Sequence, residues 1–129
     1  NLDVIHAFLA QESYWSQGVP RSVVERAIAN SLCFGVYHGD VQVGFARVVT
    51  DRSTFALLAD VFVLKGHRGK GLSKWLVRCV VEHEDLQGLR RFLLATSDAH
   101  GLYRQFGFDA LGNPSRFMEV FRPDIYRSR

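Results

Sequence analysis

A short run that combines basic side chains with glycines marks the place where this sequence could bind an anion. The run lies between an apolar stretch and a stretch with helical periodicity. It consists of Arg68, Gly69, Lys70, Gly71, Leu72 and Ser73. Glycines allow a tight turn that directs several N–H groups at one point, and the dipole of a following helix adds positive charge there. These residues therefore predict a phosphate-binding turn.

Two common classes of phosphate-binding turn do not fit this spacing. A nucleoside-triphosphate P-loop requires a glycine five residues before its Gly-Lys pair and a Ser or Thr directly after it. Leu64 and Gly71 occupy those two positions. A dinucleotide-binding fingerprint that starts at Gly69 requires a third glycine at position 74, which is occupied by Lys74. The spacing excludes both classes.

A third pattern, Arg/Gln-x-x-Gly-x-Gly/Ala after a buried strand, matches residues 68–73 at every required position except Ser73. About thirty residues downstream, a second motif places Ala99 four residues before Tyr103 and ends in Gly107-Phe108. With both motifs in this order, the chain resembles the GNAT-type N-acetyltransferase superfamily from about residue 32 to residue 121.

The resemblance implies that the chain uses acetyl-CoA as a co-substrate. The backbone at Val61, Phe62 and Val63 would lie along the pantetheine arm, with pairing through Val61 and Val63. The N–H of Val61 would polarise the acetyl carbonyl, and the amides of residues 68–73 would hold the pyrophosphate. Thr96 stands where many relatives carry an Asn that bonds the pantetheine, so its hydroxyl would make one such bond.

Tyr103 and Asp60 are the residues expected to carry the catalysis. Tyr103 matches the family's general acid, and a phenol with a pKa near 10 suits a thiolate leaving group. Its alternative role is that of a packing residue on an amphipathic helix. The motifs do not fix the base: the family's glutamate position is Leu57 here, and Asp60 is the nearest carboxylate on that strand. A salt bridge or a turn cap explains Asp60 equally well, and Glu12, Asp51 or water are alternative bases.

The resemblance also implies transfer of an acetyl group to a primary amine by direct attack on the thioester. We expect a small molecule to carry the amine. A protein lysine or N-terminus as the acceptor, and a CoA-binding module without turnover, remain open. In this family the acceptor is usually selected by the first two helices and the loop that joins them, here residues 12–18. Tyr14 and Trp15 in this loop either wall a pocket or pack in the core.

Hydrophobic periodicity predicts the elements that position these residues. Helices are expected over residues 2–10 and from Pro20 onward. Gly39-Asp40 is a two-residue hairpin signal between two β-rich runs. The predicted strands are residues 32–37, 41–49, 55–64, 91–95, 106–110 and 116–121. Residues 55–64 are almost entirely apolar, which predicts a central strand buried on both faces.

Two further helices are expected around the second half of the sheet. The apolar face of the first is predicted to consist of Leu72, Trp75, Leu76, Cys79, Val80 and His83. The second is short, begins with a cap by Ser97 or Asp98, and ends at Gly107. The element order and the resemblance together predict a single-domain α/β, GNAT-like fold over residues 1–129. Its sheet would be mixed, mostly antiparallel and twisted, with helices on both faces, and the family's first strand is expected to be missing upstream.

The composition limits the classes of partner. The 129 residues are 47% hydrophobic, enough for one domain with a buried core, and no apolar stretch approaches the roughly 20 residues of a membrane span. A net charge of +3 is too small to indicate a nucleic-acid-binding surface. Cys33 and Cys79 are expected to be buried free thiols of a reducing compartment, which favours the cytoplasm. No metal site is expected, and the chain is expected to be a monomer or a homodimer.

Overall fold

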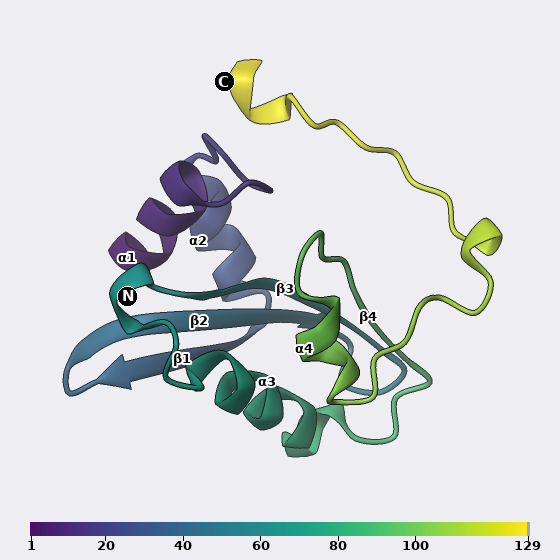
Figure 1. The fold of residues 1–129 in the computed structure, drawn as a ribbon. Coiled ribbons are helices and arrows are strands. Elements are labelled where there is room, and N and C mark those ends of the chain that lie inside the picture. The colour runs from purple at the N-terminus through teal and green to yellow at the C-terminus, as the bar shows by residue number, and fades with distance from the viewer. Residues whose placement is uncertain (129) are drawn as a thin grey trace.

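A four-stranded sheet with the order β1-β2-β3-β4 forms the centre of the computed structural model, which describes residues 1–128 (Figure 1). The strands are β1 (Leu32–His38), β2 (Val41–Thr50), β3 (Phe55–Val63) and β4 (Arg91–Leu94). The first three strands pair antiparallel and β4 runs parallel to β3. This confirms a mixed, mostly antiparallel sheet, and it confirms the hairpin turn at Gly39-Asp40.

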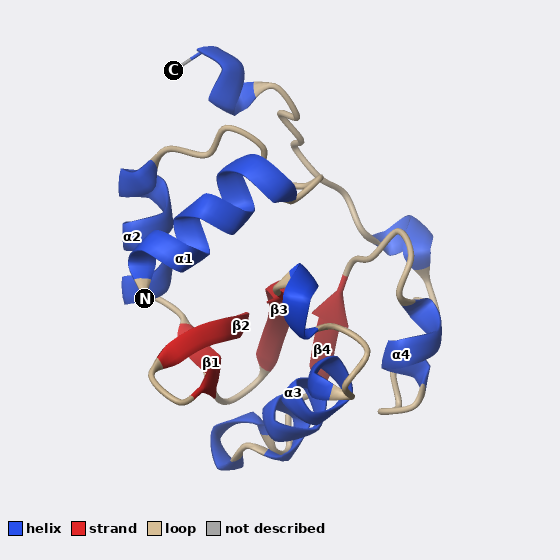
Figure 2. Cartoon of the chain, turned by 60° about the vertical axis from the view of Figure 1, so that its left-hand side comes forward, coloured by secondary structure: helices blue, strands red, loops and turns tan. Residues whose placement is uncertain are grey.

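Helices cover both faces of the sheet, as predicted (Figures 1 and 2). On one face, α1 (Leu2–Ala7) and α2 (Arg21–Ala29) share a core with side chains from β2 and β3. On the other face, α3 (Leu72–Glu82) and α4 (His100–Arg104) pack in a second core with all four strands. Short 3-10 turns complete the chain at Lys65–His67, Glu84–Leu86, Pro114–Arg116 and Ile125–Ser128. None of the described helices is long and apolar enough to cross a bilayer.

The first helix ends in a widened turn. Residues Phe8–Glu12 have π-helical geometry, and the N–H of Ser13 donates to the carbonyl of Phe8 at 2.9 Å, five residues back. Ile5, Phe8 and Leu9 are buried, as their helical spacing predicts. The wider turn carries the chain directly into the loop that contains Tyr14 and Trp15.

A β-bulge interrupts β3 at Asp60. The pairing with β2 shifts by one residue there, because Phe45 pairs with Phe62 whereas Arg47 pairs with Ala59. Asp60 has a φ of 53°, in the left-handed region that aspartate tolerates better than most residues. On the other side, β3 pairs with β4 only from Phe55 to Leu58. The two strands therefore separate just before the bulge.

The face of α3 differs from the prediction. Leu76, Val77 and Val80 are buried against the sheet, whereas Trp75 and Cys79 are exposed. Because apolar residues occupy more than one side of this helix, periodicity alone did not fix which side faces the sheet. The prediction that Cys79 is a buried thiol is therefore wrong, while Cys33 is half-buried and both cysteines are free.

The predicted strands over residues 106–110 and 116–121 do not form. After α4 the chain runs as an extended arm that returns to the side of the domain where α1 and α2 lie (Figure 1). There Tyr126 packs against the core that α1 and α2 share with the sheet. The apolar alternation of residues 116–121 suits a strand, but a strand also needs an edge to pair with. Within residues 1–128, no strand pairs with the outer edge of β4.

Candidate active site

The glycine-rich turn presents a row of backbone N–H groups that have no partner within residues 1–128. Gly69 and Gly71 have φ values of +80° and +76°, and Gly71 directly precedes α3. The first backbone bond of the helix joins the N–H of Trp75 to the carbonyl of Gly71 at 3.1 Å. In the described structure, no N–H from Gly69 to Lys74 donates to any acceptor. Free N–H groups at a helix N-terminus suit an anion, and the phosphate-binding role of this turn stays a prediction.

Arg68 ties this turn to the end of β3. Its Nε donates to the carbonyl oxygen of Val63 at 2.8 Å. One lone pair of the carbonyl expected to face the pantetheine arm is thus already used, and one remains. A Cβ added at Gly69 or Gly71 would meet no atom within 4 Å, so the left-handed backbone, rather than crowding, is what requires glycine there.

A cavity of about 760 Å³ opens where β3 and β4 separate. The predicted site residues that line it are Asp60, Val61, Phe62, Val63, Arg68, Ser73, Thr96 and Tyr103. Gly69, Lys70, Gly71 and Leu72 do not line it but connect Arg68 to Ser73, so the N–H row lies beside the cavity. The structure thus brings together residues from both sequence motifs and from the central strand.

Tyr103, on α4, lines this cavity. The residue is 8% exposed, its ring packs near Phe108 at 6.0 Å between centroids, and its hydroxyl has no partner in the described chain. Burial raises the pKa of Tyr103, and the charges of Tyr14 and Asp98 act in the same direction. The phenol is therefore held protonated and is free to donate.

The turn that leads into α4 is stabilised by Thr96. Its Oγ1 accepts from the N–H of Ala99 at 3.1 Å and from that of Asp98 at 3.4 Å. The predicted cap by Ser97 or Asp98 is wrong, because the N-cap residue of α4 is Ala99 and no side chain among the described residues accepts from the first N–H groups of the helix. The Thr96 hydroxyl can still donate its own proton into the cavity.

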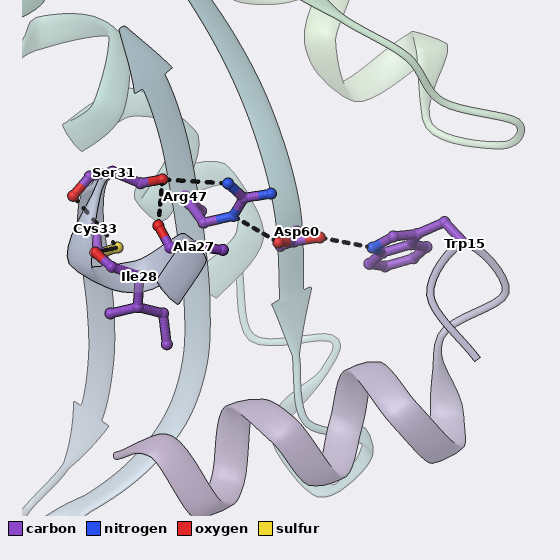
Figure 3. A network of polar contacts seen from close by, with 7 residues as sticks. All are labelled: Trp15, Ala27, Ile28, Ser31, Cys33, Arg47 and Asp60. Carbon is purple, nitrogen blue, oxygen red and sulfur yellow. Dashed lines mark hydrogen bonds and ion pairs between the residues drawn. The ribbon is translucent and has the colours of Figure 1, made fainter. Parts of the chain in front are cut away.

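Asp60 is held by partners on two other elements (Figure 3). One carboxylate oxygen accepts from Nε of Arg47 on β2 at 2.7 Å, and the other accepts from Nε1 of Trp15 at 2.8 Å. Arg47 also donates to Oγ of Ser31 at 3.1 Å. The side chains of Arg47 and Asp60 are 19% and 11% exposed, so the pair is largely buried. The salt bridge considered for Asp60 is present.

Sequence reasoning missed Arg47. The available signal was that Arg47 and Asp60 are isolated charges in two neighbouring apolar strands. A charge placed among apolar residues is stable only when it is paired, so each could have been assigned to the other.

The loop after α1 forms one wall of the cavity. Tyr14 and Trp15 are exposed, line the cavity, and contact each other edge to face at 5.0 Å between ring centroids. The Tyr14 hydroxyl accepts from the N–H of Ser97 at 3.2 Å, while Trp15 binds Asp60. This confirms that the two aromatic residues wall a pocket, and it connects the loop to both β3 and the start of α4.

Among the alternative bases, Glu12 and Asp51 lie in different places. Glu12 lines the cavity and has no polar partner in the described chain. Asp51 lies in the β2–β3 turn, outside the cavity lining. Its carboxylate accepts from the hydroxyl of Thr54 and from the N–H groups of residues 53–55, and these bonds lower its pKa.

The fold is that of an α/β domain whose mixed sheet opens beside a bulge and whose next helix begins with a row of N–H groups. The sequence profile of the acetyltransferase (GNAT) domain matches residues 29–110. The chain belongs to this family.

Known proteins support this assignment. A provisionally named acetyltransferase of Gibberella zeae is 33% identical over 79% of this chain and 69% of its own length. The crystal structure of a provisionally named GNAT-family acetyltransferase from Xanthomonas campestris pv. campestris is 52% identical. It superposes with a TM-score of 0.96 over 98% of this chain and 89% of its own. A predicted acetyltransferase from Clostridium acetobutylicum, solved with acetyl-CoA, shares the fold at 12% identity with a TM-score of 0.60 over 78% of this chain and 71% of its own.

Proposed function

We propose that the protein, as one domain over residues 1–129, transfers an acetyl group from acetyl-CoA to a primary amine of a small molecule. The observation that carries this proposal is a row of N–H groups, from Gly69 to Lys74, beside a cavity lined by Tyr103. Within residues 1–128, neither these N–H groups nor the hydroxyl of Tyr103 has a hydrogen-bond partner. The relative from Clostridium acetobutylicum, which shares the fold, was solved with acetyl-CoA. The free cysteines suit a reducing compartment, and we place the activity in the cytoplasm.

The residues of this chain would divide the binding of acetyl-CoA among them. The amides of residues 68–73 hold the pyrophosphate, with the charges of Arg68 and Lys70 beside it. The backbone of residues 61–63 lies along the pantetheine arm, and the hydroxyl of Thr96 donates to it. The N–H of Val61, at the bulge, polarises the thioester carbonyl.

In the proposed reaction the amine nitrogen attacks the thioester carbon, and a C–N bond forms. The C–S bond then breaks, and the hydroxyl proton of Tyr103 moves to the leaving sulfur. The amine gives up one proton, and the phenolate regains one from solvent. The products are an acetamide and CoA with a free thiol, so no further reactant is needed.

Asp60 is the proposed acceptor of the amine proton, and Glu12 is the competing candidate. Both oxygens of Asp60 already accept hydrogen bonds, from Arg47 and from Trp15. Glu12 lines the same cavity, and its carboxylate has no polar partner among the described residues. Turnover of Asp60→Asn and of Glu12→Gln distinguishes them, because the base is the residue whose loss lowers kcat and removes the acidic limb of the pH profile.

A small acceptor is favoured by the size and walls of the cavity. Its volume of about 760 Å³ must hold the end of the pantetheine arm together with the acceptor. The contacts of Tyr14 with Ser97 and of Trp15 with Asp60 fix the loop across one side of it. A compact amine fits this arrangement better than a polypeptide segment does.

Calorimetry with acetyl-CoA, followed by a thiol-release assay over a panel of amines, tests the proposal. We expect one-to-one binding of acetyl-CoA and release of CoA thiol with at least one small primary amine. Release with peptides alone would establish a protein acetyltransferase instead. Binding without release on any acceptor would favour a CoA-binding module, and absence of acetyl-CoA binding would refute the proposal.

A further inference from the structure

A chain of hydrogen bonds runs from the sheet to the aromatic wall of the cavity (Figure 3). Arg47, on β2, donates from Nε to one carboxylate oxygen of Asp60 at 2.7 Å, and the other oxygen accepts from Nε1 of Trp15 at 2.8 Å. Trp15 lines the cavity, whereas Arg47 is not one of the lining residues within the described part of the chain. Arg47 is therefore linked to the wall of the cavity through Asp60.

Arg47 is itself held from the side of α2. Its Nη1 donates to Oγ of Ser31 at 3.1 Å, and this hydroxyl donates to the carbonyl of Ala27, in the last turn of α2, at 2.6 Å. Because the guanidinium is planar and its N–H groups point in fixed directions, bonds to Ser31 and to Asp60 together fix its orientation. The Asp60 carboxylate is thus held in a direction that β2 and α2 determine.

The indole of Trp15 depends on this carboxylate for its orientation. Trp15 is 40% exposed, and its ring contacts are a tilted one with Phe8 at 6.2 Å and an edge-to-face one with Tyr14 at 5.0 Å between centroids. Such ring contacts tolerate a range of angles. The indole has a single hydrogen-bond donor, and that donor is used on Asp60. This bond therefore selects one orientation of the ring in the cavity wall.

We infer that Arg47 is a positioning residue, which sets the orientation of Trp15 through Asp60 and thereby the fit of the acceptor amine. The inference rests on the proposed acetyl transfer, and it holds whether Asp60 or Glu12 takes the proton of the amine. Without Arg47, Asp60 would be a carboxylate only 11% exposed and without a counter-charge, so it would turn toward water. Trp15 would then lose its acceptor, and the wall would no longer present one fixed surface.

The fluorescence of Trp15 tests the first step without any turnover. The chain has two tryptophans, and Trp75 is exposed on α3, so Trp75→Phe leaves Trp15 as the only indole. In this background, Arg47→Met should shift the emission to longer wavelengths and raise the quenching by acrylamide. Ser31→Ala removes the hydroxyl that holds Arg47 and should shift both in the same direction. This milder variant decides the question if Arg47→Met does not fold.

Kinetics test the second step, with an amine that the thiol-release assay identifies. Trp15→Phe keeps a ring in the wall and removes its N–H. Arg47→Met and Trp15→Phe should each raise the KM of the acceptor by about 10-fold, and neither should change the KM of acetyl-CoA. The double variant should raise the acceptor KM no more than the larger single effect, because both changes break the same link.

The matched control separates positioning from a loss of stability. Val80 is fully buried on α3, in the core on the other face of the sheet. Val80→Ala destabilises the protein by leaving a cavity, but it does not touch the chain from Ser31 to Trp15. The fluorescence of Trp15 and the KM of the acceptor should therefore remain those of the wild type.

Three results would overturn the inference. The first is unchanged Trp15 fluorescence in both Arg47→Met and Ser31→Ala. The second is an equal change in Val80→Ala, which would indicate general loosening of the fold. The third is an acceptor KM that stays unchanged in Arg47→Met or rises additively in the double variant. Absence of thiol release with every amine would instead refute the proposed function, and the fluorescence would still decide whether Arg47 orients Trp15.

Discussion

Removing the charge of Asp60 should destabilise the protein far more than removing that of an exposed carboxylate. Asp60→Asn keeps the tolerance for a left-handed backbone and an acceptor for Trp15, so the main change is that Arg47 loses its counter-charge. Breaking a buried ion pair by removing one partner costs about 3–5 kcal/mol. Because the two side chains remain 19% and 11% exposed, we expect about 2–4 kcal/mol.

Urea unfolding measures this loss. With a slope of about 2 kcal/mol/M, in the middle of the usual range, the midpoint should fall by roughly 1–2 M without a change in slope. The control is Asp3→Asn, because Asp3 pairs with Arg21 at 2.5 Å on the surface. Exposed pairs contribute about 0–1 kcal/mol, so the control should shift the midpoint little.

A double-mutant cycle isolates the pair itself. Arg47→Met should also destabilise, whereas Arg47→Met with Asp60→Asn should lose less than the sum of the two, by about 1–3 kcal/mol. If Asp60→Asn lost less than about 1 kcal/mol and the cycle showed no coupling, the ion pair would not stabilise the bulge. The bond to Trp15 and the backbone of β3 would then have to hold it.

Three further outcomes are expected. Gly71→Val should weaken acetyl-CoA binding by about 10–100-fold in calorimetry. The control is Gly88→Val, because Gly88 has a similar φ of +71° and equally open space around it, and this variant should bind acetyl-CoA as the wild type does. Equal losses of affinity in the two variants would mean that backbone strain, not the anion site, is responsible. Tyr103→Phe should lower kcat by about 100-fold without changing acetyl-CoA affinity, while Tyr37→Phe, at an exposed tyrosine, should have no effect. Because burial raises the pKa of Tyr103, the kcat of the wild type should fall with rising pH only above about 10. Asp51→Asn should lower stability at neutral pH. Because the fold lowers the pKa of Asp51, the stability difference between wild type and Asp51→Asn should disappear as the pH falls below about 4 in acid unfolding experiments. A difference that stays constant across pH would contradict stabilisation of the β2–β3 turn by the Asp51 carboxylate.

The sheet could be predicted from the sequence because its signals are local. β-branched and aromatic runs, broken by Gly39-Asp40, set the limits of β1 and β2 to within one residue. The glycine turn and the start of α3 follow from the motif at residues 68–73. These features depend on backbone preferences that each residue carries with it.

The features that could not be predicted depend on partners distant in sequence. The bulge at Asp60 sets the register that brings Arg47 beside it, and no local pattern specifies that register. The buried side of α3 depends on the shape of the sheet beneath Val77. Residues 116–121 have a strand-like sequence, but they pair with no strand within residues 1–128, and local alternation does not specify whether a pairing forms.

The π-helical turn at Phe8–Glu12 lies between α1, which packs on the sheet, and the loop with Tyr14 and Trp15, which lines the cavity. Its extra residue lies between the side chains that anchor α1 and the aromatic loop over the cavity. An α-helical residue turns the chain by about 100° and a π-helical residue by less, so four α residues cover nearly the same angle as five π residues. The turn therefore takes up one extra residue without rotating the loop beyond it relative to Ile5. Deleting one residue from the turn should restore α geometry and leave the contact between Tyr14 and Ser97 in place. The π-helical turn thus makes the position of the cavity wall insensitive to a one-residue change in the length of the segment after α1.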